Sequence, residues 1–218
     1  MQVSRRATGL IGDLGRHRAA NGEGAPTRRR EPRVSRGASG KPGDALDVLR
    51  SKPLERSCTV KPRVYIETSV LSYLTSWPSR DLVKAAHQEV TIEWWAGRER
   101  FDLFVSEAVL GEISRGDPGA ARLRLVAAEG LPALTATPEA QALAGALLRA
   151  AAMPAKAAID AAHVAIATVH GMNFLLTWNC AHIANAVMRE SIEEVCRRHG
   201  FRPPVICTPE ELTLQEDT

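Results

Sequence analysis

Short apolar runs alternate with longer segments of helical periodicity from residue 60 onward. The runs are rich in Val, Ile, Leu and Phe, and such runs bounded by polar residues predict β-strands. We expect strands at residues 63–66, 101–105, 174–177 and 205–207, with a brief one at 134–136. The run at 174–177 is apolar almost throughout, which is typical of a strand buried on both faces.

The segments between these strands carry helix start and stop signals. Thr68 or Ser69 is the expected cap of the first helix and Ser106 of the third, because short hydroxyl side chains accept hydrogen bonds from free helical N–H groups. Gly171 and Gly200 are expected to close the last two helices. The helices are predicted at about 68–74, 81–97, 106–113, 120–128, 138–151, 155–170 and 183–199.

This alternation predicts the fold class. Strands separated by helices form βαβ units, so we expect an α/β fold with a parallel sheet covered by helices on both faces. Ligands of such sheets bind outside the carboxyl ends of the strands. Functional residues are therefore expected just after Ile66, Val105, Thr177 and Cys207.

Charge is distributed unevenly along the chain. The first 60 residues carry 13 Lys and Arg against 6 Asp and Glu, a balance of +7, whereas the remainder has a balance of −4. All ten aromatic residues follow position 60, and 8 of the 16 glycines precede it. A segment of this composition buries too little apolar surface to offset the entropy of ordering. We expect residues 1–60 to be a disordered basic tail and residues 61–218 to form the folded domain.

Three interpretations of the basic tail remain open. It can be a nonspecific basic segment, or an arm that binds nucleic acid, since Lys and Arg attract phosphate electrostatically. Alternatively, residues 1–59 are encoded upstream of the true start, because Val60 can be read from a GUG start codon. The tail does not resemble a secretory signal, since no continuous apolar stretch follows Arg5 and Arg6.

The cysteines and the apolar runs indicate the compartment. The four cysteines form no CxxC pair, which argues against a zinc site or a disulfide framework and favours a reducing cytosol. The longest apolar runs fall well short of the roughly 18 residues that a membrane span needs. We therefore expect a cytoplasmic protein without a transmembrane helix. The cysteines are Cys58, Cys180, Cys196 and Cys207.

Acidic residues gather where the site is expected. Glu67 follows the first strand, Glu107 and Glu112 lie on the helix after the second, and Asp160 lies near the start of the helix at 155–170. Neighbouring carboxylates stay ionised together only around a cation, and oxygen ligands without sulfur select Mg²⁺ or Mn²⁺. Such a site suits metal-assisted hydrolysis of a nucleic-acid backbone. Polar neighbours follow the third long strand: Thr177, Asn179 and His182.

Each of these residues also has a structural interpretation. Glu67 could satisfy free N–H groups at a helix start, and Glu112 could be an ordinary exposed glutamate. Asp160 could pair with Lys156 one turn earlier. His163 is interpreted as a buried, hydrogen-bonded neighbour rather than a ligand. Only the joint placement of the acids favours a metal site.

Four stretches of the chain resemble the PIN-domain family of nucleases, and within it the VapC-like toxins of type II toxin–antitoxin pairs. The resemblance covers roughly residues 61–212, and its motifs follow one another in the family's order and spacing. The stretches are YIETSV at 65–70, VSEAVLGEI at 105–113, DAAHVAIA at 160–167 and LTWNCAHI at 176–183.

This resemblance implies a three-layer α/β/α sandwich with a mostly parallel central sheet, and four acidic positions around Mg²⁺ or Mn²⁺. Those positions fall on Glu67, Glu112, Asp160 and Asn179, of which the first three would bind metal. Two depart from the family pattern, in which the first and fourth acids are usually Asp. Glu67 is longer by one methylene, and Asn179 keeps a carbonyl ligand but loses a charge, so the site is nominally −3. The supporting residues are Thr68, Ser69, Thr177, His163 and His182.

The resemblance further implies an endoribonuclease that cleaves single-stranded RNA, is held inactive by a small antitoxin, and forms a homodimer. The balance of −4 over residues 61–218 argues against a broad electrostatic surface for nucleic acid. The alternative is a catalytically impaired PIN-fold module that binds RNA or protein, which the changes at Glu67 and Asn179 favour. A Rossmann-type cofactor protein is less consistent with the sequence, because no GxGxxG follows the first strand.

Overall fold

The computed structural model describes residues 60–213. The predictions for residues 1–59 therefore lie outside the described residues. The described part contains five strands, with one or two α-helices between consecutive strands and seven α-helices in all. Two short 3₁₀ helices, Arg98–Arg100 and Ala155–Ala157, precede β2 and α6. The strands are β1 (Arg63–Ile66), β2 (Asp102–Ser106), β3 (Ala133–Leu134), β4 (Phe174–Leu176) and β5 (Val205–Cys207). The helices are α1 (Thr68–Thr75), α2 (Leu82–Ala96), α3 (Glu107–Ile113), α4 (Pro118–Ala127), α5 (Pro138–Arg149), α6 (Ala158–Val169) and α7 (Ala186–Arg198).

The strands form one five-stranded sheet in the order β3-β2-β1-β4-β5, and every described pair is parallel. The predicted α/β fold with a parallel sheet is confirmed. Strand order reverses between β1 and β4, so the crevice at their carboxyl ends is the point at which such sheets bind ligands. Tyr65 pairs with Leu175 and Ile66 with Leu176 across this junction.

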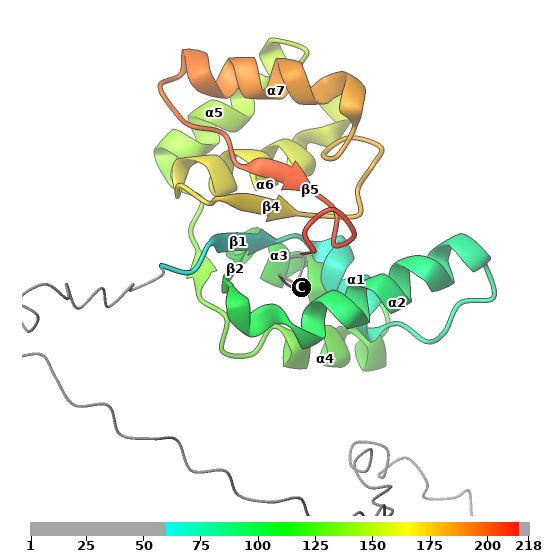
Figure 1. The fold of residues 1–218 in the computed structure, drawn as a ribbon. Helices are drawn as coiled ribbons and strands as arrows, with labels where there is room; N and C mark the ends of the chain where they lie inside the picture. The colour runs from blue at the N-terminus through cyan, green and yellow to red at the C-terminus, as the bar shows by residue number, and fades with distance from the viewer. Residues whose placement is uncertain (1–59, 214–218) are drawn as a thin grey trace, which may run out of the picture. The chain divides into compact units, whose positions relative to one another are not determined.

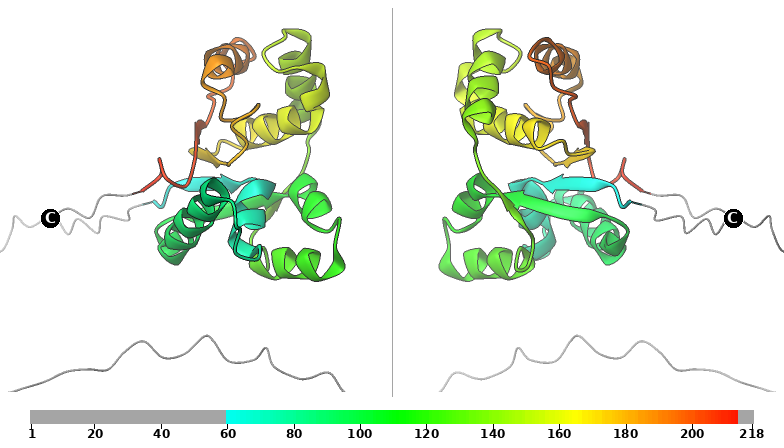
Figure 2. Two further views of the ribbon diagram at one scale, coloured as in Figure 1. Left: turned by 90° about the vertical axis from the view of Figure 1, so that its right-hand side faces the viewer. Right: turned by 90° about the vertical axis from the view of Figure 1, so that its left-hand side faces the viewer.

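The helices form two groups. Helices α1 to α4 contact one another beside the β1–β2 half of the sheet, and α5 packs against α6 and α7 beside the β4–β5 half (Figure 1). The two views in Figure 2 keep the same grouping. Helix α3 contacts α6, so the two groups meet at one place. That contact brings the side chains of α3 and α6 together beside the carboxyl end of β1.

The core is built from the central strands. Val64, Tyr65 and Ile66 of β1 have no exposed surface, nor do Leu175 and Leu176 of β4. Such burial fits the near-continuous apolar runs that predicted these strands, because parallel strands between two helical layers are covered on both faces. Tyr65 is the one residue of this set with a polar group, and that group needs a hydrogen-bond partner inside the protein.

Several helix starts and caps differ from prediction. Helix α4 begins at Pro118 and not at 120, and α6 begins at Ala158 and not at 155, because Ala155–Ala157 form a 3₁₀ helix. Helix α1 is capped by Glu67, whose carboxylate accepts from the Ser69 N–H, and not by Thr68 or Ser69. The last helix begins at Ala186 and not near 183, because Asn185 caps it and accepts from the Val187 N–H. The other predicted caps are confirmed: Ser106 caps α3, and Gly171 and Gly200 follow their helices with positive φ.

Candidate metal site at the carboxyl end of the sheet

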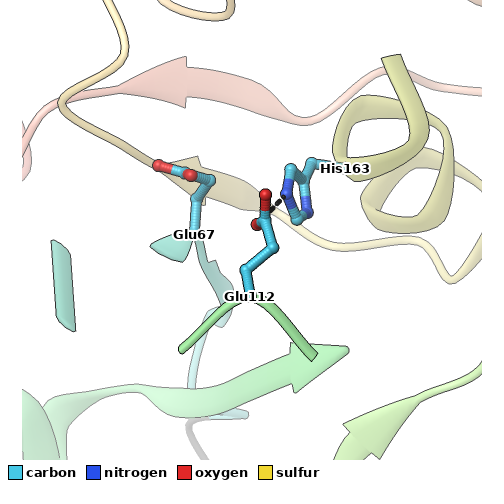
Figure 3. Close-up of side chains that lie close together, drawn as sticks. All are labelled: Glu67, Glu112 and His163. Carbon is cyan, nitrogen blue, oxygen red and sulfur yellow. Dashed lines mark hydrogen bonds and ion pairs between the residues drawn. The ribbon is translucent and has the colours of Figure 1, made fainter. Parts of the chain in front are cut away.

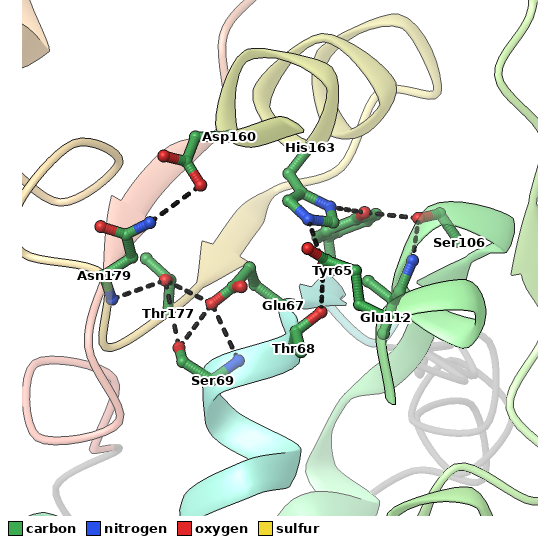
Figure 4. Close-up of polar contacts among 11 residues, drawn as sticks. Tyr65, Glu67, Thr68, Ser69, Ser106, Glu112, Asp160, His163, Thr177 and Asn179 are labelled. Atoms are coloured by element: carbon green, nitrogen blue, oxygen red, sulfur yellow. Dashed lines mark hydrogen bonds and ion pairs between the residues drawn. The ribbon is translucent and has the colours of Figure 1, made fainter. Parts of the chain in front are cut away.

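Polar side chains from four elements meet beside the junction of β1 and β4. Glu67 follows β1 and Thr177 follows β4, while Glu112 projects from α3 and His163 from α6 (Figure 4). The carboxyl ends of parallel neighbours lie at the same edge of a sheet, which explains why residues 110 positions apart touch. These polar side chains therefore gather at the carboxyl ends of the strands, where functional residues are expected from the sequence.

Glu67 is 5% exposed and is held by three donors on one carboxylate oxygen. Its Oε2 accepts from the Ser69 backbone N–H at 3.1 Å, from the Thr177 hydroxyl at 2.8 Å and from the Ser69 hydroxyl. No donor among residues 60–213 bonds to the other oxygen, Oε1. Glu67 is therefore both a helix cap and an oriented carboxylate with one oxygen available for a ligand.

The hydroxyl groups around Glu67 are themselves tied to the loop after β4. Thr177 Oγ1 accepts from the Asn179 N–H at 2.9 Å, and Ser69 Oγ accepts from the Trp178 N–H at 2.8 Å. The predicted supporting residues Ser69 and Thr177 thus link the start of α1 to this loop. Both hydroxyls have a proton left for Glu67 because they accept from the backbone.

Glu112 is partly buried and also receives its hydrogen bonds on one oxygen. Its Oε2 accepts from the Thr68 hydroxyl at 2.6 Å and lies 2.9 Å from His163 Nε2. The hydrogen bond from His163, assisted by that from Thr68, holds the pKa of the Glu112 carboxyl below its usual range, although burial opposes this. Glu112 is therefore a negative charge at neutral pH.

His163 is 1% exposed, and both of its ring nitrogens are engaged. Nε2 contacts Glu112, and Nδ1 lies 2.7 Å from the Tyr65 hydroxyl. The interpretation of His163 as a buried, hydrogen-bonded neighbour agrees with these contacts. A metal ion could bind His163 only by replacing one of them.

Glu67, Glu112 and His163 each place one potential ligand atom within 4.8 Å of the others (Figure 3). No Lys or Arg among residues 60–213 forms an ion pair with either glutamate. Two carboxylates this close attract a cation, and their oxygens are the donors that Mg²⁺ and Mn²⁺ prefer. The residues present therefore fit a divalent cation held by oxygen ligands.

Asp160 does not belong to this group of three. Its Oδ1 accepts from the Asn179 side-chain amide at 3.0 Å, and its Oδ2 lies 2.7 Å from His182 Nδ1. Pairing with Lys156, the structural alternative, is not among the ion pairs of the described residues. Asp160 lies one turn before His163 on α6, so it borders the group of three while its own oxygens bond elsewhere.

Asn179 and His182 form a small network with Asp160. The Asn179 side-chain carbonyl accepts from the His182 N–H at 3.1 Å while its amide donates to Asp160. An aspartate at position 179 would have no side-chain N–H to donate to Asp160, and its charge would repel that of Asp160. An asparagine at position 179 therefore fits its contacts with Asp160 and His182, whereas an aspartate would not.

Two residues in the site were not predicted from sequence. The Tyr65 hydroxyl lies 2.7 Å from both His163 Nδ1 and the Ser106 hydroxyl. Ser106 was predicted only as a helix cap, and Tyr65 only as a strand residue. A tyrosine in a strand that is otherwise apolar was the available signal, because a buried hydroxyl requires a partner.

Taken together, the fold and site define a parallel α/β protein with two oriented carboxylates at the switch point of its sheet. Comparison with protein families and with curated proteins found no match. A chain in the crystal structure of VapBC2 from Rickettsia felis, bound to a DNA fragment from their promoter, is similar at a TM-score of 0.42. Its sequence identity is 12%, over 67% of this chain and 98% of that chain. That similarity is too low to assign a family.

The helices described between residues 60 and 213 include none that is both long and apolar enough to cross a membrane.

Proposed function

We propose that this protein is a metal-dependent endoribonuclease of the VapC-like kind, the toxin of a toxin–antitoxin pair. The observation that carries the proposal is the approach of Glu67 and Glu112 to within 4.8 Å of each other and of His163. The four sequence stretches that resemble PIN domains, with Glu67 and Glu112 at two of the acidic positions, support the same function.

The side chains divide into those that hold a cation and those that orient them. Glu67 and Glu112 would hold Mg²⁺ or Mn²⁺, each through the oxygen that no described donor occupies. When bound, the cation would activate water and stabilise charge on the phosphodiester. Thr177 and Ser69 orient Glu67, and Thr68 and His163 orient Glu112.

The sequence resemblance implies that Asp160 binds the metal and that Asn179 is the fourth position around it. In this proposal both residues instead lie beside the metal ligands. They bond to each other, and Asp160 also holds His182, so they shape the side of the site formed by α6 and the loop after β4. We propose that Asp160 contributes its charge to the site from this position. The sequence resemblance makes a small antitoxin protein and a second copy of this chain the first partners to look for.

The test is cleavage of single-stranded RNA by the full chain with Mg²⁺ or Mn²⁺, compared with Glu67→Gln and Glu112→Gln. We expect EDTA to abolish cleavage and each variant to lower its rate about 100-fold or more, because the cation contributes several kcal/mol. The matched control is Glu107→Gln, which changes an exposed glutamate on the same helix as Glu112. Cleavage that survives EDTA, or equal loss in the control, contradicts the proposal.

A catalytically impaired module that binds RNA or protein is the second candidate function. The observation that favours it is the use of both Asp160 oxygens and of the Asn179 amide in contacts within the chain. This candidate predicts RNA binding that EDTA leaves unchanged, with no cleavage by the wild-type chain. Saturable binding of Mn²⁺ that is lost in Glu112→Gln would count against it.

A further inference from the structure

A continuous series of hydrogen bonds, buried except at its partly buried Glu112 end, runs from the start of α3 to Glu112. The Val109 N–H donates to Ser106 Oγ at 3.2 Å, and Ser106 Oγ lies 2.7 Å from the Tyr65 hydroxyl. The Tyr65 hydroxyl then lies 2.7 Å from His163 Nδ1, and His163 Nε2 lies 2.9 Å from Glu112 Oε2. Figure 4 shows the side chains of Ser106, Tyr65, His163 and Glu112, with their contacts drawn as dashed lines.

The groups at the two ends of this series of hydrogen bonds determine where its protons lie. The Val109 N–H can only donate, and an ionised Glu112 can only accept. Suppose that each hydroxyl hydrogen points toward the Glu112 end of the series. Ser106 then donates to Tyr65, Tyr65 donates to His163 Nδ1, and His163 Nε2–H donates to Glu112. Every donor and acceptor in the series is then satisfied.

The opposite direction leaves groups unsatisfied. If Tyr65 donated to Ser106, the Ser106 proton would have no acceptor among the described residues. A neutral His163 would then carry its proton on Nδ1, and its bare Nε2 would face the Glu112 carboxylate. Unpaired polar groups at buried positions are costly, so this arrangement is disfavoured.

We propose that Tyr65 and Ser106 are positioning residues that hold His163 in the Nε2–H tautomer and thereby fix the Glu112 carboxylate. With Oε2 bonded to His163 and Thr68, Glu112 keeps the rotamer that places it beside Glu67. The benefit for a bound cation rests on the proposed function, but the tautomer does not.

The decisive experiment is nitrogen NMR of the histidine rings in the full chain, without added metal. We expect His163 to carry its proton on Nε2 in the wild type. Tyr65→Phe should shift the His163 signals toward the other tautomer, because the ring of Phe fits the same space but cannot donate to Nδ1. The matched control is Tyr73→Phe, since Tyr73 is the only other tyrosine and its hydroxyl bonds to no described residue.

Either of two results overturns the proposal. One is a wild-type His163 protonated on Nδ1, and the other is a folded Tyr65→Phe with unchanged His163 signals. The wild-type spectrum decides the tautomer by itself, so the test does not depend on the folding of the variant.

Calorimetry with Mn²⁺ then tests the consequence for Glu112. We expect Tyr65→Phe to bind Mn²⁺ about 10-fold more weakly than the wild type and Tyr73→Phe to bind it equally well. His163→Gln should retain more affinity than His163→Leu, because a glutamine amide can still donate to Glu112. If affinity in Tyr65→Phe is unchanged, the positioning role is wrong. If the wild type binds no Mn²⁺, the proposed function fails while the NMR result still decides the tautomer.

Discussion

Single residues at the carboxyl end of β1 serve the fold and the candidate site at once. Glu67 caps α1 with the same carboxylate that faces Glu112, and Ser106 caps α3 while bonding to Tyr65. A substitution at either residue therefore changes helix stability as well as the site. Gln is therefore the substitution to test at positions 67 and 112, because it removes the charge while its side-chain carbonyl can still accept hydrogen bonds.

The pKa of Glu112 makes stability depend on pH in a defined direction. The folded protein holds this pKa below 4.5, the ordinary value, chiefly through the hydrogen bond from His163. Ionised Glu112 therefore stabilises the fold above pH 4.5, and this contribution is lost as pH falls through the folded pKa.

Urea unfolding across the acid range checks this prediction. We expect the free energy of unfolding to fall less steeply with decreasing pH in Glu112→Gln than in the wild type. Glu107→Gln, on the same helix, should follow the wild type in this comparison. Parallel curves for Glu112→Gln and the wild type would show that Glu112 gains no such stabilisation.

At the scale of elements, helix α6 determines which side chains reach the site. It is rich in alanine, and Ala161, Ala165 and Ala167 are completely buried where α6 packs against α5, β4 and α3. Small side chains allow this close approach, which sets how far His163 extends toward Glu112 and Tyr65. The spacing of the site thus depends on tight packing behind α6.

Ala165→Leu is expected to destabilise the fold by about 1–3 kcal/mol, because three added carbons have no space in a packed core. Ala158→Leu, at an exposed position of the same helix, should change stability by about 0.5 kcal/mol at most. Thermal unfolding of both variants measures the difference. Equal stability of the two variants would mean that α6 can shift away from its neighbours.

At the scale of the whole molecule, the described part is one packed unit in which β5 and α7 bury their inner faces, although Val205 of β5 and Val187 of α7 are exposed. Cys207 of β5 is 4% exposed and Cys196 of α7 is fully buried. Burial raises the pKa of the Cys207 thiol to about 12 and raises that of Cys196 as well. Cys180, in the loop after β4, is exposed.

Thiol labelling of the native chain is therefore expected to modify Cys180 while sparing Cys196 and Cys207. The two buried thiols should react only at the rate of unfolding, since a buried thiol is both inaccessible and protonated. Peptide mapping by mass spectrometry identifies each site, and labelling in denaturant provides the control in which Cys180, Cys196 and Cys207 all react. Rapid labelling of native Cys207 would indicate local opening of β5.

The amino-acid sequence by itself determined the order of elements, the parallel α/β class and the edge of the sheet where polar residues gather. These features follow from apolar periodicity, capping residues and closing glycines, which act over a few neighbouring positions. The strand ends also predicted that Glu67 would meet the acids of the following helices, Glu107, Glu112 and Asp160. Among these, only the resemblance to a known family singled out Glu112 over Glu107.

Only the tertiary structure decided that His163 joins these glutamates while Asp160 turns to Asn179 and His182. It also revealed the contact between Tyr65 and His163, which are 98 positions apart. Residues one turn apart on α6 share a helix face, so sequence spacing cannot choose between them. The orientation of α6 in the fold determines that His163 contacts Glu112 and Tyr65 while Asp160 contacts Asn179 and His182.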